Sequence, residues 1–287
     1  MITEREPLPP VPPPYEREPL PPVPPPSALP PLLYTAEDHA FVVCAYMESP
    51  YLAECISSLL AQTQKSSIVI STSTPNDHIK QIAEAYGIPV RVNSEPPSIS
   101  GDWNFAYKQA DKRLITLAHQ DDIYLPEYLS TALEMLNSSK DPIIFFSHYA
   151  ILADGEVIHK NRRLKVRKSL LKPMKKCQRS TFIRRRLLSL GNIICCPSVM
   201  FADLESLEFS GELKCNLDWQ KWEELSKKQG SFVYCEKPLL YHRLHGDAES
   251  ARALQEGVRS CEDNIMFRKF WPAPIARILT KLYTKSE

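Results

Sequence analysis

Short apolar segments alternate with amphipathic segments from residue 40 onward, and this alternation constrains the fold more than any other feature. The segments AFVVCAY (40–46) and SIVIST (67–72) are continuous apolar runs of strand length, and RLITLA (113–118) follows the same pattern. Apolar residues between these runs recur at helical spacing. Continuous apolar strands separated by helices are typical of a mainly parallel β-sheet covered on both faces. We therefore predict an α/β fold with such a sheet flanked by helices.

The intervening segments carry the signals that mark helix ends. Ser49 and Pro50 are expected to begin the first helix, and Thr74 and Pro75 the second, which Gly87 ends. In sheets of this kind, ligands bind at the carboxyl ends of the strands. The polar residues that follow each strand are therefore the candidates for a functional site.

The N-terminal segment has a different composition from the rest. The sequence EREPLPPVPPP occurs twice, at 4–14 and at 16–26. Proline fixes φ and removes the backbone donor, so residues 1–36 are predicted to be a disordered, extended tether in the polyproline II conformation. The alternative is a docking site for an aromatic groove, because Pro9 and Pro12 have the required spacing.

Positive charge is concentrated in one segment. Thirteen Lys or Arg and no Asp or Glu lie between Lys160 and Arg186, although the formal net charge of the chain is +1. Apolar residues alternate with these cations, which suits an anionic membrane surface or a phosphorylated acceptor. A solvated basic surface is the alternative. The run lacks interleaved aromatic residues, so nucleic acid is not an expected partner.

The C-terminal stretch from Pro274 is expected to form a basic amphipathic helix. Its apolar face comprises Ile275, Ile278, Leu279 and Leu282. This face is predicted to pack on the catalytic domain, and a peripheral membrane contact is the alternative.

Cysteine usage and hydropathy bear on localisation. The eight cysteines have no paired C-x-x-C spacing and are interpreted as free thiols. No run approaches the roughly 20 apolar residues of a spanning helix, and no secretory signal is recognised. The expected location is the cytoplasm, with peripheral contact at the inner face of the membrane as a further expectation.

Two adjacent carboxylates are the first chemical signal. Asp121 and Asp122 directly follow the apolar run that ends at Ala118. Adjacent carboxylates repel each other unless a cation or strong donors lie between them. Hard cations such as Mg²⁺ bind one or two carboxylates together with phosphate oxygens. The alternative is that Asp122 caps the helix that starts near Pro126.

Three other polar groups are candidates for the same site. Asp218 opens a predicted helix, where capping is the alternative role. The segment 242–245 (HRLH) follows an apolar strand; Arg forms forked phosphate contacts, and neutral His is a metal ligand. Asp102 and Asn104 flank Trp103 and either line a nucleoside pocket or begin a helix.

The order of these features resembles the family 2 glycosyltransferases, which have the Rossmann-like A-type glycosyltransferase fold. The resemblance runs from about Ala40 to Ser250. Its most specific parts are the blocks YMESPYLAECISSLLAQT (46–63) and HQDDIYLPEYL (119–129), with the region 216–245. It implies a catalytic domain at 37–250, followed by a C-terminal helical extension at 251–287. It also implies a nucleotide-sugar donor, a glycan or lipid-linked acceptor, and Mn²⁺ or Mg²⁺.

The resemblance assigns roles residue by residue. Asp218 stands at the position of the catalytic base. The metal ligands implied are Asp121, Asp122 and His245. The nucleotide-sugar-binding residues implied are Ala45, Tyr46, Thr72, Asp102, Asn104, Asp121 and Arg243. In two places the chain departs from the family pattern. His119 replaces the first acid of the Asp-x-Asp motif, and the second strand ends in Ser71–Ser73, where the family has an Asp that reads the nucleobase.

The function implied is metal-dependent transfer of a sugar to an acceptor hydroxyl, with inversion at the anomeric carbon and Asp218 as base. The alternative is a catalytically silent nucleotide-sugar-binding or scaffold protein that uses the proline-rich segment. His119, in place of an acid, favours this alternative.

Overall fold

A computed structural model describes residues 33–246 and 258–284, and the described residues from Tyr34 onward form a single compact unit. The proline-rich repeat lies outside the described residues. None of the eight cysteines is in a disulfide.

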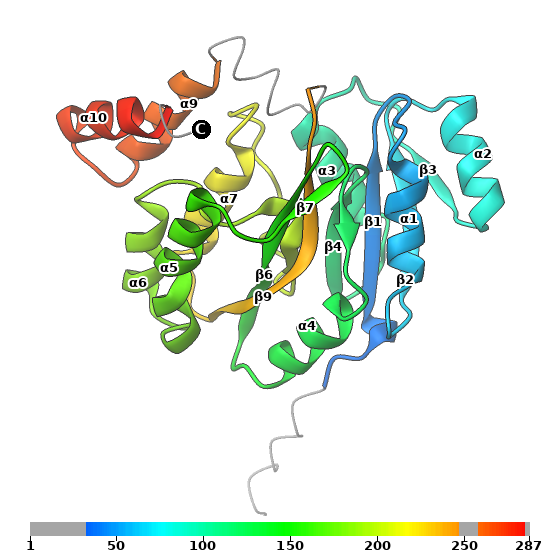
Figure 1. The fold of residues 1–287 in the computed structure, drawn as a ribbon, viewed down its shortest axis with the longest axis horizontal. Coiled ribbons are helices and arrows are strands. Elements are labelled where there is room, and N and C mark those ends of the chain that lie inside the picture. The colour runs from blue at the N-terminus through cyan, green and yellow to red at the C-terminus, as the bar shows by residue number, and fades with distance from the viewer. Residues whose placement is uncertain (1–32, 247–257, 285–287) are drawn as a thin grey trace, which may run out of the picture. The chain divides into compact units, whose positions relative to one another are not determined.

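One half of the sheet is parallel, as predicted from the apolar runs. Its strands, in spatial order, are β3 (Val90–Val92), β2 (Ser67–Thr72), β1 (His39–Ala45) and β4 (Leu114–His119). Neighbouring strands in this half all pair in parallel. Their carboxyl ends therefore meet at one edge of the sheet (Figure 1).

The other half of the sheet is mixed. Continuing from β4, it contains β8 (Val199–Phe201), β6 (Pro142–Ala153), β9 (Ser231–Leu244) and β5 (Ile123–Tyr124), with β7 (Glu156–Ile158) paired to β6. β8 is antiparallel to both β4 and β6, whereas β6 and β9 are parallel. The pairing of β5 with β9 is antiparallel, and it brings the end of β9 beside the turn that follows β4. The α/β prediction is confirmed.

Helices cover both faces of the sheet. They are α1 (Leu52–Leu60), α2 (Asp77–Tyr86), α3 (Ile99–Lys108), α4 (Tyr128–Asn137), α5 (Arg162–Lys176), α6 (Thr181–Leu188), α7 (Leu217–Leu225), α9 (Val258–Arg268) and α10 (Ala273–Thr284). Alternate residues of β1 enter two separate cores, Val42 with α3 and α7, and Val43 with α1 and α4. Burial on both faces explains why the strand is apolar at every position from Ala40 to Ala45.

Two helix starts differ from the prediction. α1 begins at Leu52 rather than directly after Ser49. α2 is capped by the side chain of Asn76, which accepts from the backbone N–H of Ile79 at 2.9 Å. Thr74, the predicted cap, instead accepts from the backbone N–H of Met47 at 2.6 Å and so joins the ends of β1 and β2. Gly87 ends α2 with a left-handed φ of 65°, as predicted.

The basic run is partly internal, so not all of its cations lie on a solvated surface. Arg184 is fully buried, and its guanidinium donates to three backbone oxygens in residues 226–230. Arg185 forms an ion pair with Glu223 at 2.9 Å, and Arg186 stacks over Trp271 at 4.5 Å. These three arginines hold α6 against its neighbours, whereas the outer positions of α5 are exposed.

α10 packs through a face other than the predicted one. Its buried residues are Ala276 and Thr280, and Leu279 and Tyr283 pack beside them. The side chains of Ile275, Ile278 and Leu282 are exposed, so three of the four residues predicted to pack do not. Among the described residues, no helix is both long enough and apolar enough to cross a membrane.

Candidate active site

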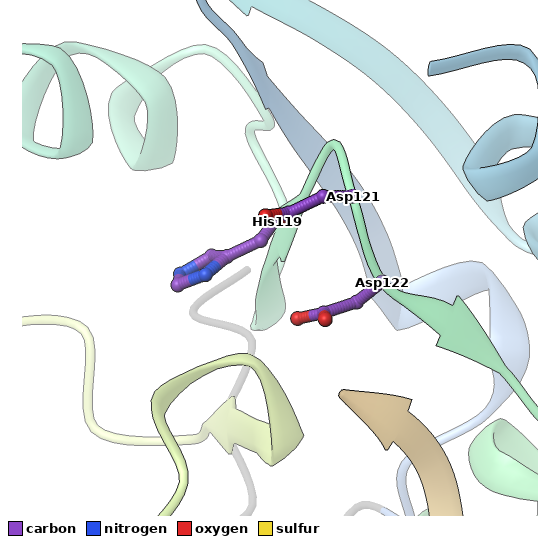
Figure 2. Close-up of side chains that lie close together, drawn as sticks. All are labelled: His119, Asp121 and Asp122. Carbon is purple, nitrogen blue, oxygen red and sulfur yellow. The ribbon is translucent and has the colours of Figure 1, made fainter. Parts of the chain in front are cut away.

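Three side chains at the carboxyl end of β4 form a group that could hold a metal ion. His119 ends the strand, and Asp121 and Asp122 occupy the turn before β5. Each offers one ligand atom, and these atoms lie within 4.8 Å of one another. Figure 2 shows the three side chains extending to the same side of the turn. We call this group the metal-ligand cluster; it adds His119 to two of the predicted ligands.

Asp122 is the buried member of the metal-ligand cluster. Its Oδ1 accepts the backbone N–H of Arg243 at 2.9 Å and lies 3.0 Å from His242 Nδ1. Its Oδ2 is buried and has no hydrogen-bond partner among the described residues. Buried carboxylate oxygens are normally bonded, so this atom fits a bound cation. Glu127, not Asp122, precedes α4, which rules out the capping role.

Histidines surround the second carboxylate. Asp121 Oδ2 lies 2.9 Å from His245 Nε2. Burial acts to raise the pKa of Asp121, but His119, His245 and His242 outweigh it and hold that pKa below its usual value. His119 Nε2 and His245 Nδ1 are also buried without a hydrogen-bond partner in the described part of the chain. His245 as a direct metal ligand stays a prediction, because its Nε2 contacts Asp121.

Arg243 braces the turn that carries the aspartates. Its Nε donates to the backbone oxygen of Asp121 at 2.8 Å, and its guanidinium stacks over the ring of Tyr51 at 4.3 Å. It also pairs with Glu54 of α1. The arginine thus links β9, α1 and the metal-ligand cluster, and its predicted contact with donor diphosphate remains untested.

The end of β1 is tied to the same turn. The side-chain amide of Gln120 accepts from the backbone N–H of Tyr46 and donates to its backbone oxygen, each at 3.0 Å. Ala45 is buried, whereas Tyr46 is 41% exposed. Of these two predicted donor contacts, the ring of Tyr46 is therefore the more accessible to a ligand.

A carboxylate reaches the end of β2 from outside that strand. Asp102 of α3 accepts from Ser73 Oγ and from Asn93 Nδ2, each at 2.8 Å. Thr72 is buried, and its hydroxyl accepts the backbone N–H of Thr74 at 3.0 Å. The strand lacks the acid that the family pattern has, but Asp102 places one at the same end of the sheet.

α3 also contacts the metal-ligand cluster. The rings of Trp103 and His119 lie 5.5 Å apart between centroids. The amide of Asn104 both donates to and accepts from the backbone of Phe209 at 2.8 Å. Asn104 therefore fixes the segment before α7, and its predicted role in donor binding is not tested by these contacts.

Asp218 lies in the first turn of α7 and is half-buried. Its Oδ1 accepts the backbone N–H of Trp219 at 2.7 Å, and its Oδ2 accepts from Asn192 Nδ2 at 2.8 Å. Burial raises the pKa of Asp218, although Asn192, Trp219, Arg259 and His119 oppose the shift. A carboxylate with a raised pKa is a stronger base than an exposed one.

The segment that carries Asp218 is held by α9, which the sequence analysis did not connect with the site. Glu262 accepts the backbone N–H groups of Lys214, Cys215 and Asn216 at 2.7, 2.9 and 3.0 Å. Asp263 accepts from the side chain of Asn216 at 2.8 Å. The available signal was the adjacent acid pair itself, which has no characteristic spacing.

This arrangement is that of an α/β enzyme with its ligand groups at the carboxyl ends of parallel strands. The family described as "Glycosyl transferase family 2" matches residues 40–208, more than half of the chain. The protein belongs to this family, as the sequence resemblance implied.

Solved structures of glycosyltransferases share the fold. A mannosyltransferase from Pyrobaculum calidifontis, in complex with GDP-Man and Mn²⁺, matches with a TM-score of 0.58 at 14% identity, over 86% of this chain and 69% of that one. Residues 1–349 of S. aureus TarS, in complex with UDP-GlcNAc, match with a TM-score of 0.56 at 16% identity, over 85% and 70% of the two chains.

A third glycosyltransferase structure has a similar fold. Glucosyl-3-phosphoglycerate synthase from Mycobacterium tuberculosis, in complex with Mn²⁺, UDP and phosphoglyceric acid, matches with a TM-score of 0.53 at 14% identity, over 82% of this chain and 80% of that one. No curated protein sequence matches. At these identities the structures establish the fold.

Proposed function

We propose that this protein transfers a sugar from a nucleoside diphosphate sugar to an acceptor hydroxyl, with inversion at the anomeric carbon and with a divalent metal ion. One observation carries the proposal. The metal-ligand cluster lies at the carboxyl end of β4, and Asp218, a carboxylate of raised pKa, is within electrostatic reach of His119 in that cluster.

The residues of the cluster suit Mn²⁺ or Mg²⁺. Asp122 Oδ2 and His119 Nε2 are buried atoms without a protein partner among the described residues, and each has a lone pair to offer. Asp121 adds a second carboxylate. Mn²⁺ accepts mixed imidazole and carboxylate ligands, whereas Mg²⁺ favours oxygen, so the histidine favours Mn²⁺. When bound, the ion would neutralise charge on the diphosphate leaving group.

Asp218 would act on the acceptor. As the acceptor oxygen forms its bond to the anomeric carbon, the bond from that carbon to the diphosphate oxygen breaks, and the nucleoside diphosphate leaves with the electron pair. The carboxylate accepts the proton that the acceptor hydroxyl loses. The hydrogen bonds from Asn192 and Trp219 hold both carboxylate oxygens in one orientation.

The similar solved structures support the proposed donor and metal through their bound ligands. The mannosyltransferase and the synthase were solved with Mn²⁺ and with a nucleotide or nucleotide sugar, and TarS with UDP-GlcNAc. The silent-binding alternative depended on the replacement of an acid by His119. Because His119 lies in the metal-ligand cluster with an unpartnered Nε2, this replacement no longer favours the alternative.

The decisive experiment incubates the full-length protein with UDP-, GDP- and dTDP-sugars, with Mn²⁺, with Mg²⁺ or with a chelator. We expect release of one nucleoside diphosphate that depends on metal and increases with an acceptor. NMR of the product should give the inverted anomeric configuration. Donor binding without turnover, across the panel and with both metals, would instead establish the silent-binding alternative.

A further inference from the structure

Arg167 of α5 contacts the segment that holds the proposed base. Its Nη2 donates to the backbone oxygen of Asn192 at 3.1 Å. The side chain of the same asparagine donates to Asp218 at 2.8 Å. The guanidinium of Arg167 is therefore separated from the proposed base by a single residue.

The same guanidinium is connected to the metal-ligand cluster through two aromatic rings. Its central carbon lies 5.3 Å from the centre of the Tyr149 ring. That ring lies edge-on to His242 at 5.8 Å, and His242 contacts Asp122 at 3.0 Å. Arg167 is thus connected, through one residue or two, to both chemical groups on which the proposed transfer depends.

A second arginine of α5, Arg163, also acts on the Tyr149 ring. Arg163 precedes Arg167 by four residues, so both occupy one face of the helix. Burial raises the pKa of the Tyr149 hydroxyl, and the charges of Arg167 and Arg163 both oppose that shift. Both guanidinium groups therefore lie within electrostatic reach of this ring.

These cations lie away from β1 and β2, which carry nucleotide-sugar-binding residues that the family resemblance implies. α5 packs against β9, in the mixed half of the sheet, whereas β1, β2 and β3 form the opposite half (Figure 1). The diphosphate of the donor is assigned to the metal-ligand cluster. The guanidinium of Arg167, one residue away from the proposed base, is then a candidate for contact with the other substrate.

We propose that Arg167, assisted by Arg163, binds an anionic group carried by the acceptor, a phosphate or a carboxylate near the hydroxyl that receives the sugar. This inference rests on the proposed glycosyl transfer. A guanidinium presents paired N–H donors that match two oxygens of a phosphate or carboxylate. A cation–π contact with the ring of Tyr149 holds the guanidinium of Arg167 in place.

The test compares Arg167→Gln with Lys165→Gln, which removes an exposed charge from the same helix. Glycerol and glycerol 3-phosphate serve as matched acceptors, and hydrolysis of the donor without acceptor reports on the remaining machinery. Wild type and Lys165→Gln should prefer the phosphorylated alcohol in kcat/KM. Arg167→Gln should lower that preference by about 10- to 100-fold, the range for a lost charge-assisted hydrogen bond. Equal use of both alcohols by wild type would overturn the proposal.

A binding measurement keeps the proposal testable if no transfer is found. Calorimetry with glycerol 3-phosphate, and co-sedimentation with vesicles of phosphatidylglycerol or phosphatidylcholine, distinguish a free from a lipid-borne phosphate. Binding of either phosphate that is lost in Arg167→Gln and kept in Lys165→Gln supports the site, even if the transferase assignment fails. Binding that the two variants reduce equally, or no binding in either arm, contradicts it.

Discussion

Asn192 connects Asp218 to Tyr283, a residue of α10. The asparagine side chain donates to Asp218 Oδ2 at 2.8 Å, and its backbone N–H donates to the Tyr283 hydroxyl at 3.2 Å. The family match ends at residue 208. The proposed base is therefore supported by helices that lie beyond the matched region.

Replacing Asp218 by Asn should abolish transfer while leaving the donor bound. The amide cannot take up the acceptor proton, so we expect a loss of about 10²-fold or more in kcat, with an unchanged dissociation constant for the donor. Turnover assays and calorimetry measure the two quantities separately. Turnover within twofold of wild type would remove Asp218 as the base.

The raised pKa of Asp218 predicts how activity and stability depend on pH. Transfer requires the ionised carboxylate, so kcat should fall as pH decreases through a pKa above the usual aspartate value of 3.8. Because the folded state resists ionisation, the carboxylate lowers stability above the unfolded pKa. Asp218→Asn should therefore be the more stable protein at pH 7 in urea unfolding. This advantage should disappear below about pH 3, where both folded and unfolded wild type are protonated; an advantage that persists there contradicts the assignment.

Removing one cluster carboxylate should remove metal-dependent donor binding. Asp121→Ala deletes a ligand from a turn, so the fold should survive while Mn²⁺ affinity in the presence of UDP decreases by at least about tenfold. Glu134→Ala, which removes an exposed acid from α4, is the matched control and should bind as wild type. Unchanged activity in excess chelator would exclude the metal role altogether.

The strands and the acid pair could be predicted because each is a local pattern. β2 has the predicted bounds, and Asp121 and Asp122 follow an apolar run directly. The contacts that complete the site join distant segments. Asp102 reaches Ser73 across 29 positions, and no spacing rule indicates this.

Charge alone was misleading in the basic run. Arg184 is a cation in a basic run and would be expected at the surface. It is nevertheless fully buried, because backbone oxygens of the segment that follows α7 accept its N–H groups. Such an arginine cannot be distinguished in the sequence from its exposed neighbours. A test of membrane contact should therefore substitute exposed positions of α5 such as Lys172 and Lys176 rather than Arg184.

Glu262 should act as a positioning residue for the base. Its carboxylate accepts three backbone N–H groups just before α7, where the helix dipole also favours an anion. Glu262→Ala should lower stability by about 2 kcal/mol, because buried donors lose their acceptor. It should also lower kcat more than donor affinity. Glu262→Gln, which retains one acceptor oxygen, should recover part of both losses; Cys261→Ser, an exposed neighbour, should change neither.

α10 should stabilise the catalytic domain through Tyr283. This ring contacts Trp219 and Phe267 at centroid distances of 5.9 and 5.7 Å and lies against Gly191, where an added Cβ would meet it at 2.5 Å. Tyr283→Ala should lower the free energy of unfolding by about 2 kcal/mol, since it removes a large, partly buried ring.

Leu282→Ala is the control for that substitution. Leu282 is the preceding residue and is 61% exposed, so its truncation should leave stability within about 0.5 kcal/mol of wild type. The two variants also separate packing from membrane contact. If Tyr283→Ala unfolds at the wild-type denaturant concentration while Leu282→Ala loses binding to anionic vesicles, α10 serves as a membrane contact and not as a support for Asn192 and Asp218.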